Sequence, residues 1–225
     1  MNKIQDLVRN FENHVSKVNS ENPEFFQAVE EIAKAYGYPL SNAVVFNRNL
    51  LKITNLKYIL VADNPGMTEQ EEECYLVGKA GKTARNFFKN NGLVSDFDKE
   101  VAVLNKTFIH TKSTLDLKKL KNFKNLLEDS EKFMANLAAD MLEAADAELW
   151  ITGCSELGEK KLFAEYLKTL KERCVQNPEL KEKIFFYPHF SFGNFSKNLN
   201  SVMAKNPEMS VKKALKAAKL DVWQN

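Results

Sequence analysis

Four short apolar segments alternate with longer segments of helical periodicity through most of the chain. The apolar segments are residues 58–62, 101–104, 148–152 and 184–187. Amphipathic patterns at 126–145 and 156–173 separate the later segments, as helical crossovers do between parallel strands. Such alternation indicates a sheet with helices on both faces. We therefore expect an α/β fold, a three-layer α/β/α arrangement around a short, mainly parallel four-stranded sheet.

The two ends of the chain also carry helical patterns. These cover residues 3–18, 23–36, 197–204 and 210–219. With 225 residues, 44% of them hydrophobic, the chain can bury the core of one domain, and it shows no internal repeat or linker-like boundary. The sequence thus predicts a single domain over residues 1–225, with a helical preface at 1–50 before a core at 55–200.

Composition argues against several classes of protein. No apolar run approaches the ~18 residues needed to span a bilayer, and the start of the chain lacks the apolar core of a secretory signal. We therefore expect a cytoplasmic protein without a membrane partner. The three cysteines, Cys74, Cys154 and Cys174, form no CxxC pair or Cys/His cluster, which argues against a disulfide framework, a metal site and an iron–sulfur cluster.

Charge is balanced over the whole chain but not locally. The net charge of +2 does not by itself predict a polyanionic partner. Between Asn105 and Lys124, however, six lysines stand against one acid, Asp116. Such a stretch fits a solvated lysine-rich face about as well as a surface that contacts phosphates.

Polar residues follow three of the four predicted strands. Asp63 and Asn64 come directly after the first strand, Asn105 ends the second and His189 lies just past the fourth, whereas the third ends on Gly153. Right-handed crossovers bring the carboxyl ends of parallel strands to one edge, where open α/β sheets bind ligands. Alone, each Asn is more often a turn cap and the His a structural residue. Their joint placement favours a ligand crevice.

One apparent nucleotide motif fails on its spacing. Gly81-Lys82-Thr83 looks like the end of a P-loop, but Leu76 stands where that loop requires its first glycine. We therefore do not expect a nucleoside triphosphatase.

Four segments at these strand ends share a recognisable order and spacing: Ala62-Asp-Asn-Pro-Gly66, Leu76-Val-Gly-Lys-Ala-Gly81, Leu104-Asn105 and His189-Phe-Ser-Phe192. In order and spacing they resemble the motifs of the uracil-DNA glycosylase superfamily. The resemblance covers roughly residues 55–200. Asn64 and the His189 loop are similar to the mismatch-specific and single-strand-selective branches. The Gly78 loop looks more like the iron–sulfur branch, whose cluster cysteines are missing here.

The resemblance implies a monofunctional DNA glycosylase that flips out uracil or a related damaged base and hydrolyses its N-glycosidic bond. It implies that His189 donates a hydrogen bond to uracil O2 and that Asn64 orients the attacking water. Because an amide takes no proton at neutral pH, Asp63 is the suspected base, with Glu69 and Glu71 as backups. On this interpretation, Asn64→Asp keeps or raises activity.

The resemblance also implies the residues that hold the base and the strand. Asn105 would pair with N3–H and O4 of uracil, and Tyr75 and Leu76 would line the base pocket. The expected DNA contacts are Gly78, Lys79, Lys106, Lys112, Ser191 and Asn194. We expect a monomer that binds DNA and needs no metal or cofactor.

Several positions depart from the superfamily pattern and leave alternatives open. The stacking phenylalanine corresponds to Leu76, and Phe190 and Phe192 replace prolines of the His189 loop. Gly193 stands where some members carry an intercalating leucine. These departures are compatible with an inactive nucleic-acid-binding module on the same fold. The modest net charge is compatible with an enzyme that acts on a free nucleoside.

Overall fold

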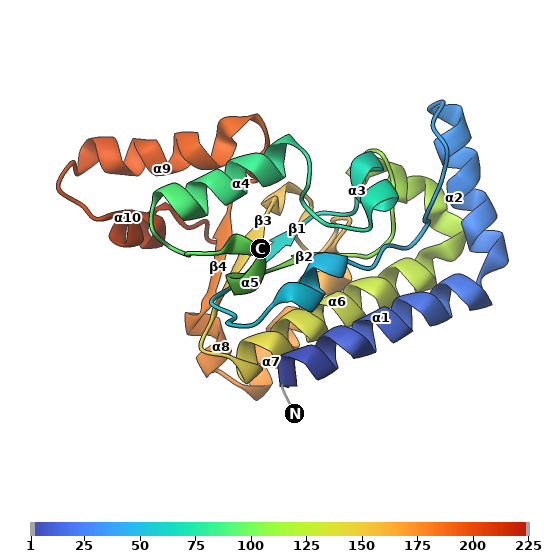
Figure 1. Cartoon of the computed structure of the whole chain (residues 1–225), viewed down its shortest axis with the longest axis horizontal. Helices are drawn as coiled ribbons and strands as arrows, with labels where there is room; N and C mark the ends of the chain where they lie inside the picture. The colour runs from blue at the N-terminus through green and yellow to red at the C-terminus, as the bar shows by residue number, and fades with distance from the viewer. Residues whose placement is uncertain (1–2, 224–225) are drawn as a thin grey trace.

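The centre of the fold is a four-stranded, fully parallel sheet (Figure 1). A computed structural model describes residues 3–223, apart from the side chain of Phe192. The strands are β1 (Tyr58–Ala62), β2 (Val101–Asn105), β3 (Glu148–Thr152) and β4 (Ile184–Tyr187). Their order in the sheet is β2-β1-β3-β4, and Ala62 at the end of β1 lies opposite Asn105 at the end of β2. The predicted strands are confirmed, with β2 one residue longer than expected.

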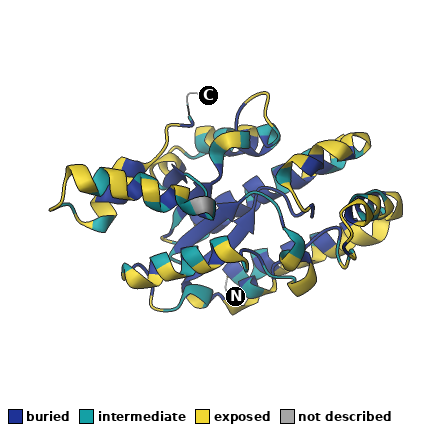
Figure 2. Ribbon diagram, turned by 90° about the horizontal axis from the view of Figure 1, so that it is seen from above, coloured by how far each residue is buried: buried dark blue, intermediate teal, exposed yellow. Residues whose placement is uncertain are grey.

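Helices cover both faces of the sheet, so the predicted three-layer α/β/α fold is confirmed. On one face lie α1 (Lys3–Glu21), α6 (Lys124–Ala144) and α7 (Ala164–Gln176), and on the other α4 (Lys79–Asn90), α9 (Asn194–Lys205) and α10 (Val211–Ala218). Figure 2 shows the buried sheet between these two layers, with the exposed residues on the outer sides of the helices.

Aromatic packing joins the sheet to the layer of α4 and α9. The Trp150 ring of β3 lies 5.0 Å from the ring of Phe88 on α4 and 6.4 Å from that of Phe195 on α9. Tyr58 of β1 meets Phe88 edge-on at 5.1 Å, and Tyr187 of β4 meets Trp150 at 5.0 Å. Strands buried on both sides need apolar residues at nearly every position, which explains the unbroken apolar runs of the sequence.

The helical preface belongs to the same hydrophobic core. Helix α1 packs along α6, and the fully buried ring of Phe11 lies 5.3 Å from that of Phe46 and 5.7 Å from that of Phe133. Among the described residues, no helix is both long and apolar enough to cross a membrane.

Short elements connect these layers. They are α2 (Pro23–Ala35), α3 (Met67–Glu72), α5 (Phe97–Glu100), α8 (Glu179–Glu182), and the 3-10 turns η1 (Arg48–Lys52), η2 (Thr114–Phe123), η3 (Cys154–Glu156) and η4 (Ser191–Gly193). The predicted helix at 156–173 begins only at Ala164. Gly158 has a φ of +150°, which no right-handed helix contains, so the chain loops before α7 starts.

Candidate functional site

A cavity of about 480 Å³ opens at the carboxyl edge of the sheet. Its wall comes from the ends of β1 and β4, from α3, from the first turn of α4 and the loop before it, and from the segment that leads into η2 with the first residue of η2. The lining residues are Ala62, Asp63, Asn64, Gly66, Met67, Thr68, Glu69, Leu76, Gly78, Lys79, Ala80, Gly81, Thr111, Lys112, Thr114 and His189. Residues from three of the four resembling segments therefore meet around one space.

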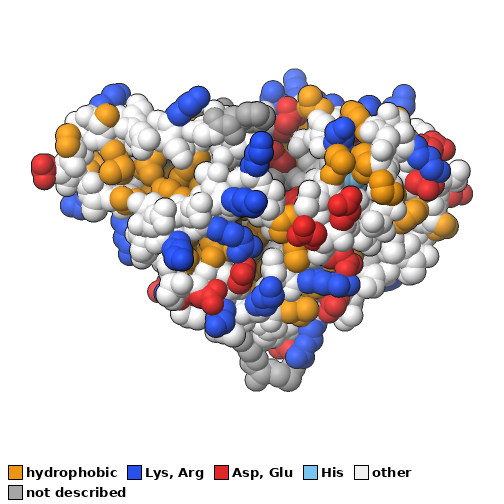
Figure 3. Space-filling model, turned by 45° about the horizontal axis from the view of Figure 1, so that its top comes forward, with side chains coloured by type: hydrophobic (Ala, Val, Ile, Leu, Met, Phe, Trp, Pro, Cys, Tyr) orange, Lys and Arg blue, Asp and Glu red, His pale blue; other side chains and the backbone are white. Residues whose placement is uncertain are grey.

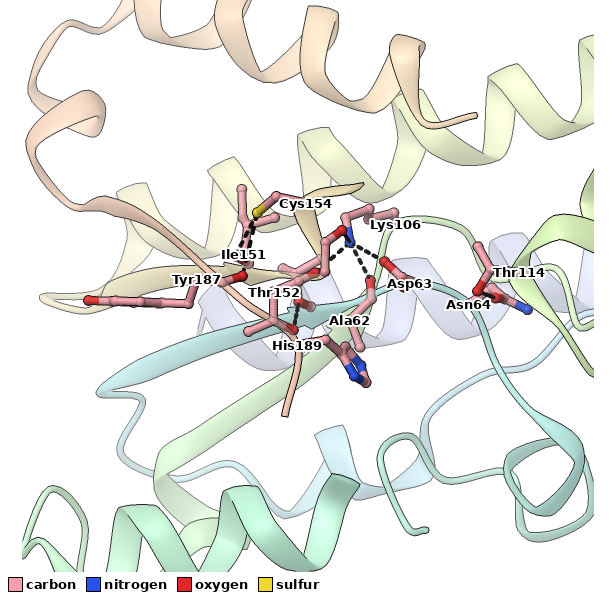
Figure 4. Close-up of polar contacts among 12 residues, drawn as sticks. Ala62, Asp63, Asn64, Lys106, Thr114, Ile151, Thr152, Cys154, Tyr187 and His189 are labelled. Atoms are coloured by element: carbon pink, nitrogen blue, oxygen red, sulfur yellow. Dashed lines mark hydrogen bonds and ion pairs between the residues drawn. The ribbon is translucent and has the colours of Figure 1, made fainter. Parts of the chain in front are cut away.

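A buried ion pair lies beside this cavity. Lys106 Nζ lies 2.5 Å from Asp63 Oδ1 and donates to the carbonyl oxygens of Thr152 at 2.6 Å and Gly153 at 3.1 Å (Figure 4). These three close acceptors match the three protons of an ammonium group, and Ala62 O lies farther away at 3.5 Å. The Lys106 side chain is fully buried, whereas that of Asp63 is 25% exposed.

Lys106 is therefore not the DNA contact that we expected from the sequence. Its backbone N–H donates to the carbonyls of Ala62 and Asp63, and its side chain runs beneath the strand ends instead of into solvent. The sequence places a lysine directly after one buried strand and an aspartate directly after another, but only the strand order makes these two strand ends neighbours.

Gly153 makes room for the Asp63 carboxylate. A Cβ at this position would lie 2.6 Å from Asp63 Oδ1 and 2.9 Å from Oδ2, and the backbone is left-handed at φ +76°. Both the backbone conformation and the close approach favour glycine. The strand end that seemed least informative in the sequence thus shapes the site as much as the others.

His189 presents a hydrogen-bond donor to the cavity. The Ser191 backbone N–H donates to His189 Nδ1 at 3.0 Å, and Ser191 Oγ lies 2.8 Å from the same nitrogen. Because Nδ1 accepts, the neutral ring carries its proton on Nε2. Burial lowers the pKa of His189, the negative charge of Asp63 opposes this and the positive charge of Lys106 lowers the pKa further.

Two residues near His189, Ser191 and Asn194, were predicted to contact DNA, and they lie in different surroundings. Ser191 is half-buried, and its hydroxyl faces His189. Asn194 is exposed at the start of α9 and does not line the cavity.

Asn64 holds a neighbouring segment in place. Its Nδ2 donates to Thr111 O at 3.0 Å, Thr111 Oγ1 at 3.1 Å and Pro65 O at 3.2 Å, and Thr114 Oγ1 donates to its Oδ1 at 2.8 Å. An aspartate would set a carboxylate against two carbonyl oxygens. These contacts argue against the expectation that Asn64→Asp keeps or raises activity.

Glu69 braces the loop that carries Leu76. Its carboxylate accepts from Gly66 N at 2.7 Å and from Leu76 N, and Leu76 has a φ of +55°. Burial raises the pKa of Glu69, although backbone N–H groups of Gly66, Leu76 and Val77 oppose this. A Cβ on Gly81 would lie 1.5 Å from Leu76 O, so only glycine fits at this position in the first turn of helix α4.

The two acids named as backup bases are therefore poorly suited to that role. Glu69 is committed to the loop, and Glu71 is exposed and absent from the cavity wall.

Two predicted base-binding residues lie outside the cavity wall. Tyr75 is fully buried and donates its hydroxyl proton to Val45 O, so its ring offers no free face to a base. Asn105 is 1% exposed, and neither its Nδ2 nor its Oδ1 has a hydrogen-bond partner among the described residues. The amide lies at the strand end opposite Ala62, which does line the cavity.

A second histidine supports the site and was missed as a site residue. His110 is fully buried, with Nδ1 2.9 Å from Pro65 O and Nε2 2.9 Å from the Tyr38 hydroxyl. Nδ1 must donate to the carbonyl, so Nε2 accepts from Tyr38. Burial lowers the pKa of His110. His110 and Tyr38 together fix the Pro65-Gly66 turn. No local sequence signal links these residues, because they lie far apart in the chain.

No group of three or more His, Cys, Asp or Glu side chains within residues 3–223 could hold a metal ion.

No protein-family model matches the chain, and a search of curated proteins finds no match. The case for a function therefore depends on the site's geometry and on the motifs in the sequence.

Gly153→Ala should destabilise the protein more than Gly92→Ala. Both glycines are left-handed, at φ +76° and +62°, but a Cβ on Gly92 meets nothing within 4 Å. Each change carries a backbone cost of roughly 1–2 kcal/mol. Only Gly153→Ala also displaces the Asp63 carboxylate. Urea denaturation measures both free energies of unfolding, and equal losses would contradict the packing of Asp63 on Gly153.

Asn64→Asp should lower the free energy of unfolding by roughly 1–3 kcal/mol at pH 7, because its carboxylate faces the carbonyls of Pro65 and Thr111. The matched control is Asn55→Asp, at an exposed position, which should change stability by less than about 0.5 kcal/mol. Thermal denaturation followed by circular dichroism compares them. A stable Asn64→Asp protein would show that the amide is not needed as a donor.

Proposed function

We propose that the chain is a DNA glycosylase that hydrolyses the N-glycosidic bond of uracil or a related damaged base. The proposal combines the resemblance of four sequence segments with the chemistry of the cavity wall. Asp63 offers a carboxylate and His189 a neutral donor, and the two come from the ends of β1 and β4. Neither group requires a metal or a cofactor to act in this reaction.

The observation that carries the proposal is the unpaired amide of Asn105. A buried polar group without a partner costs about 1–3 kcal/mol, so such an amide is expected to have a ligand. An amide has one acceptor and one donor group side by side, and with its oxygen toward N3–H and its nitrogen toward O4 it matches the edge of uracil. The amide is covered in this conformation, so a base reaches it only after part of the cavity wall moves.

His189 would stabilise the leaving base. Breaking the bond between C1′ and N1 sends the bonding electrons to the base, whose O2 gains negative charge. The Nε2–H group of neutral His189 can donate to that oxygen without first taking a proton from solvent. Ser191 supports this role, because its backbone N–H keeps Nδ1 as an acceptor and so keeps the proton on Nε2.

Asp63 would act on the sugar side. Its Oδ1 is held by Lys106, whereas its Oδ2 has no hydrogen-bond partner among the described residues. A carboxylate in this setting can take the proton of the attacking water and stabilise the oxocarbenium-like sugar. Water oxygen then bonds to C1′, and the base leaves as an anion that solvent protonates. In this proposal Asp63, and not Asn64, is the residue that acts on the attacking water.

Contacts to the DNA backbone would come from the exposed part of the cavity wall. Gly78 and Lys79 begin helix α4, so the positive end of the helix dipole and a lysine point to the same side. Lys112 contributes a second cation from another segment of the wall. Phosphates of a bound strand are the expected partners of these groups.

Uracil release from a uracil-containing oligonucleotide tests the proposal. The wild type should release free uracil, and Asp63→Asn and His189→Ala should each lower kcat by about 10²-fold or more. Asn105→Ala should lower release of uracil without creating release of cytosine. Asn55→Asp serves as the folded control with wild-type activity.

The same assay separates the alternatives. Tight binding of single- or double-stranded DNA without release would favour an inactive nucleic-acid-binding module. Turnover of free deoxyuridine with no preference for DNA would favour a nucleoside hydrolase. Either result would overturn the glycosylase assignment.

The rate should fall on the acid side of neutrality. Because the pKa of His189 is lowered below 6.5, the ring is neutral at pH 7 and gains a proton only in more acidic solution. Single-turnover rates should therefore stay level from pH 8 to 6.5 and drop below that range. The nearby charged groups are Asp63 and Lys106, and Glu69 lies on the same wall.

His189→Asn distinguishes the histidine from these neighbours. The asparagine keeps a donor that does not titrate, so its lower rate should be level where the wild-type rate begins to fall. A wild-type rate that rises between pH 7 and 5.5 would show that the protonated ring is the active form.

A further inference from the structure

A second, smaller cavity lies at the amino edge of the sheet, opposite the edge that carries the candidate functional site. Its volume is about 170 Å³, and its wall comes from the sheet, from Leu93 and from helix α10. Tyr58 and Glu148, the first residues of β1 and β3, belong to this wall. Among the described residues, none lines both cavities. We call the second cavity the amino-edge pocket.

Aromatic side chains of the sheet form one part of this wall. They are buried, and they are Tyr58, Trp150, Phe185 and Tyr187. The ring of Trp150 lies 5.3 Å from that of Tyr58 and 5.0 Å from that of Tyr187. A further aromatic ring packs well against such a group, edge-on or offset. Since a cavity of about 150 Å³ holds one benzene molecule, the amino-edge pocket has room for a single ring.

One polar group of the aromatic wall lacks a partner. Tyr58 is only 8% exposed, and its hydroxyl makes no hydrogen bond within residues 3–223. The indole N–H of Trp150, by contrast, donates to Glu148 Oε2 at 2.9 Å. A buried hydroxyl is costly to leave unpaired, so the Tyr58 hydroxyl is expected to meet a polar atom of a ligand.

Lysines of α10 form another part of the wall. Lys212, Lys213 and Lys216 are exposed, and none of them forms an ion pair within the described part of the chain. The helix that carries them is held on the sheet, because the Tyr187 hydroxyl donates to Leu215 O at 3.3 Å. Of the described residues that line the pocket, Glu148 alone is acidic. The charge of the pocket therefore favours an anion.

The wider surroundings of the pocket are also cationic. Residues 197–219 contain six lysines and one acid, Glu208. In Figure 3, α9 and the turn that leads to α10 lie on the left, and this end of the molecule shows more Lys and Arg than Asp and Glu side chains. Such a surface raises the local concentration of anions.

We propose that the amino-edge pocket binds a small aromatic anion, with one ring against Trp150 and a carboxylate or phosphate group on the lysines of α10. The Tyr58 hydroxyl supplies a further hydrogen bond. An aliphatic anion would lose the packing of ring against ring, and a neutral ring would leave the lysines without a counter-charge. This site goes beyond the proposed function and does not depend on it, because its wall is separate from the candidate functional site.

Titration calorimetry of the full chain tests the site with benzoate and phenyl phosphate as probes. At least one of them should bind saturably, with a dissociation constant of about 1 mM or lower. The tighter of the two identifies the preferred anionic group. Benzamide, which has the ring but no charge, and cyclohexanecarboxylate, which has the charge but no aromatic ring, should each bind about tenfold more weakly or worse.

A triple variant locates the anionic group of the probe. Replacement of the three pocket lysines, Lys212→Gln, Lys213→Gln and Lys216→Gln together, should weaken binding by about tenfold or more. The matched control removes the same charge from three exposed lysines outside the pocket and should change the affinity by less than about twofold. These are Lys89→Gln, Lys197→Gln and Lys205→Gln.

Two further variants locate the ring. Tyr58→Phe keeps the aromatic wall and removes only the hydroxyl, so binding should weaken by about threefold or more. Trp223→Phe leaves Trp150 as the only tryptophan of the chain. The fluorescence of Trp150 should then change along the same saturation curve that calorimetry records.

Four outcomes would overturn this inference. Absence of saturable binding of both probes would exclude the site, and equally tight binding of benzamide or cyclohexanecarboxylate would exclude its chemistry. An equal loss of affinity in the two triple lysine variants would show attraction by net charge alone. Saturable binding without a change in Trp150 fluorescence would place the probe elsewhere. None of these results bears on uracil release.

Discussion

The ion pair between Lys106 and Asp63 ties the site to the sheet. The carboxylate follows β1, the ammonium group follows β2, and the two carbonyls that complete its shell lie at the end of β3. A fully buried ammonium group requires compensation for its lost hydration, so these strand ends cannot shift apart without a large cost. The carboxylate beside the cavity is therefore held by the same contacts that close the edge of the sheet.

The sheet was predictable because its signal is local. Residues such as Tyr58–Ala62 are buried on both faces, and that requirement alone leaves an unbroken apolar run in the sequence. The place of Asp63 and His189 followed from the same reasoning, since parallel strands end at one edge. The residues at which helices begin were harder to predict from the sequence. A single glycine in an unusual conformation, such as Gly158, moves the start of a helix by several residues.

Contacts between strand ends could not be predicted, because they depend on the order β2-β1-β3-β4. Lys106 looked like a surface cation until its neighbours were known, and Gly153 looked uninformative for the same reason. Asn64 was assigned to the attacking water by resemblance, and its hydrogen bond to Thr114, 50 positions away, left no sign in the sequence. Tyr75 and Leu76 were both assigned to the base pocket, and of the two only Leu76, whose backbone is left-handed, lines the cavity.

The glycine that accommodates the Asp63 carboxylate has an evolutionary consequence. A larger residue at 153 would displace the carboxylate, and a neutral residue at 63 would leave the ammonium group of Lys106 without its counter-charge. A substitution at any one of positions 63, 106 and 153 would therefore disturb the other two. Descendants of this chain should keep Asp63, Lys106 and Gly153 as a set or exchange them together, so their joint substitution would mark a change in the chemistry of the site.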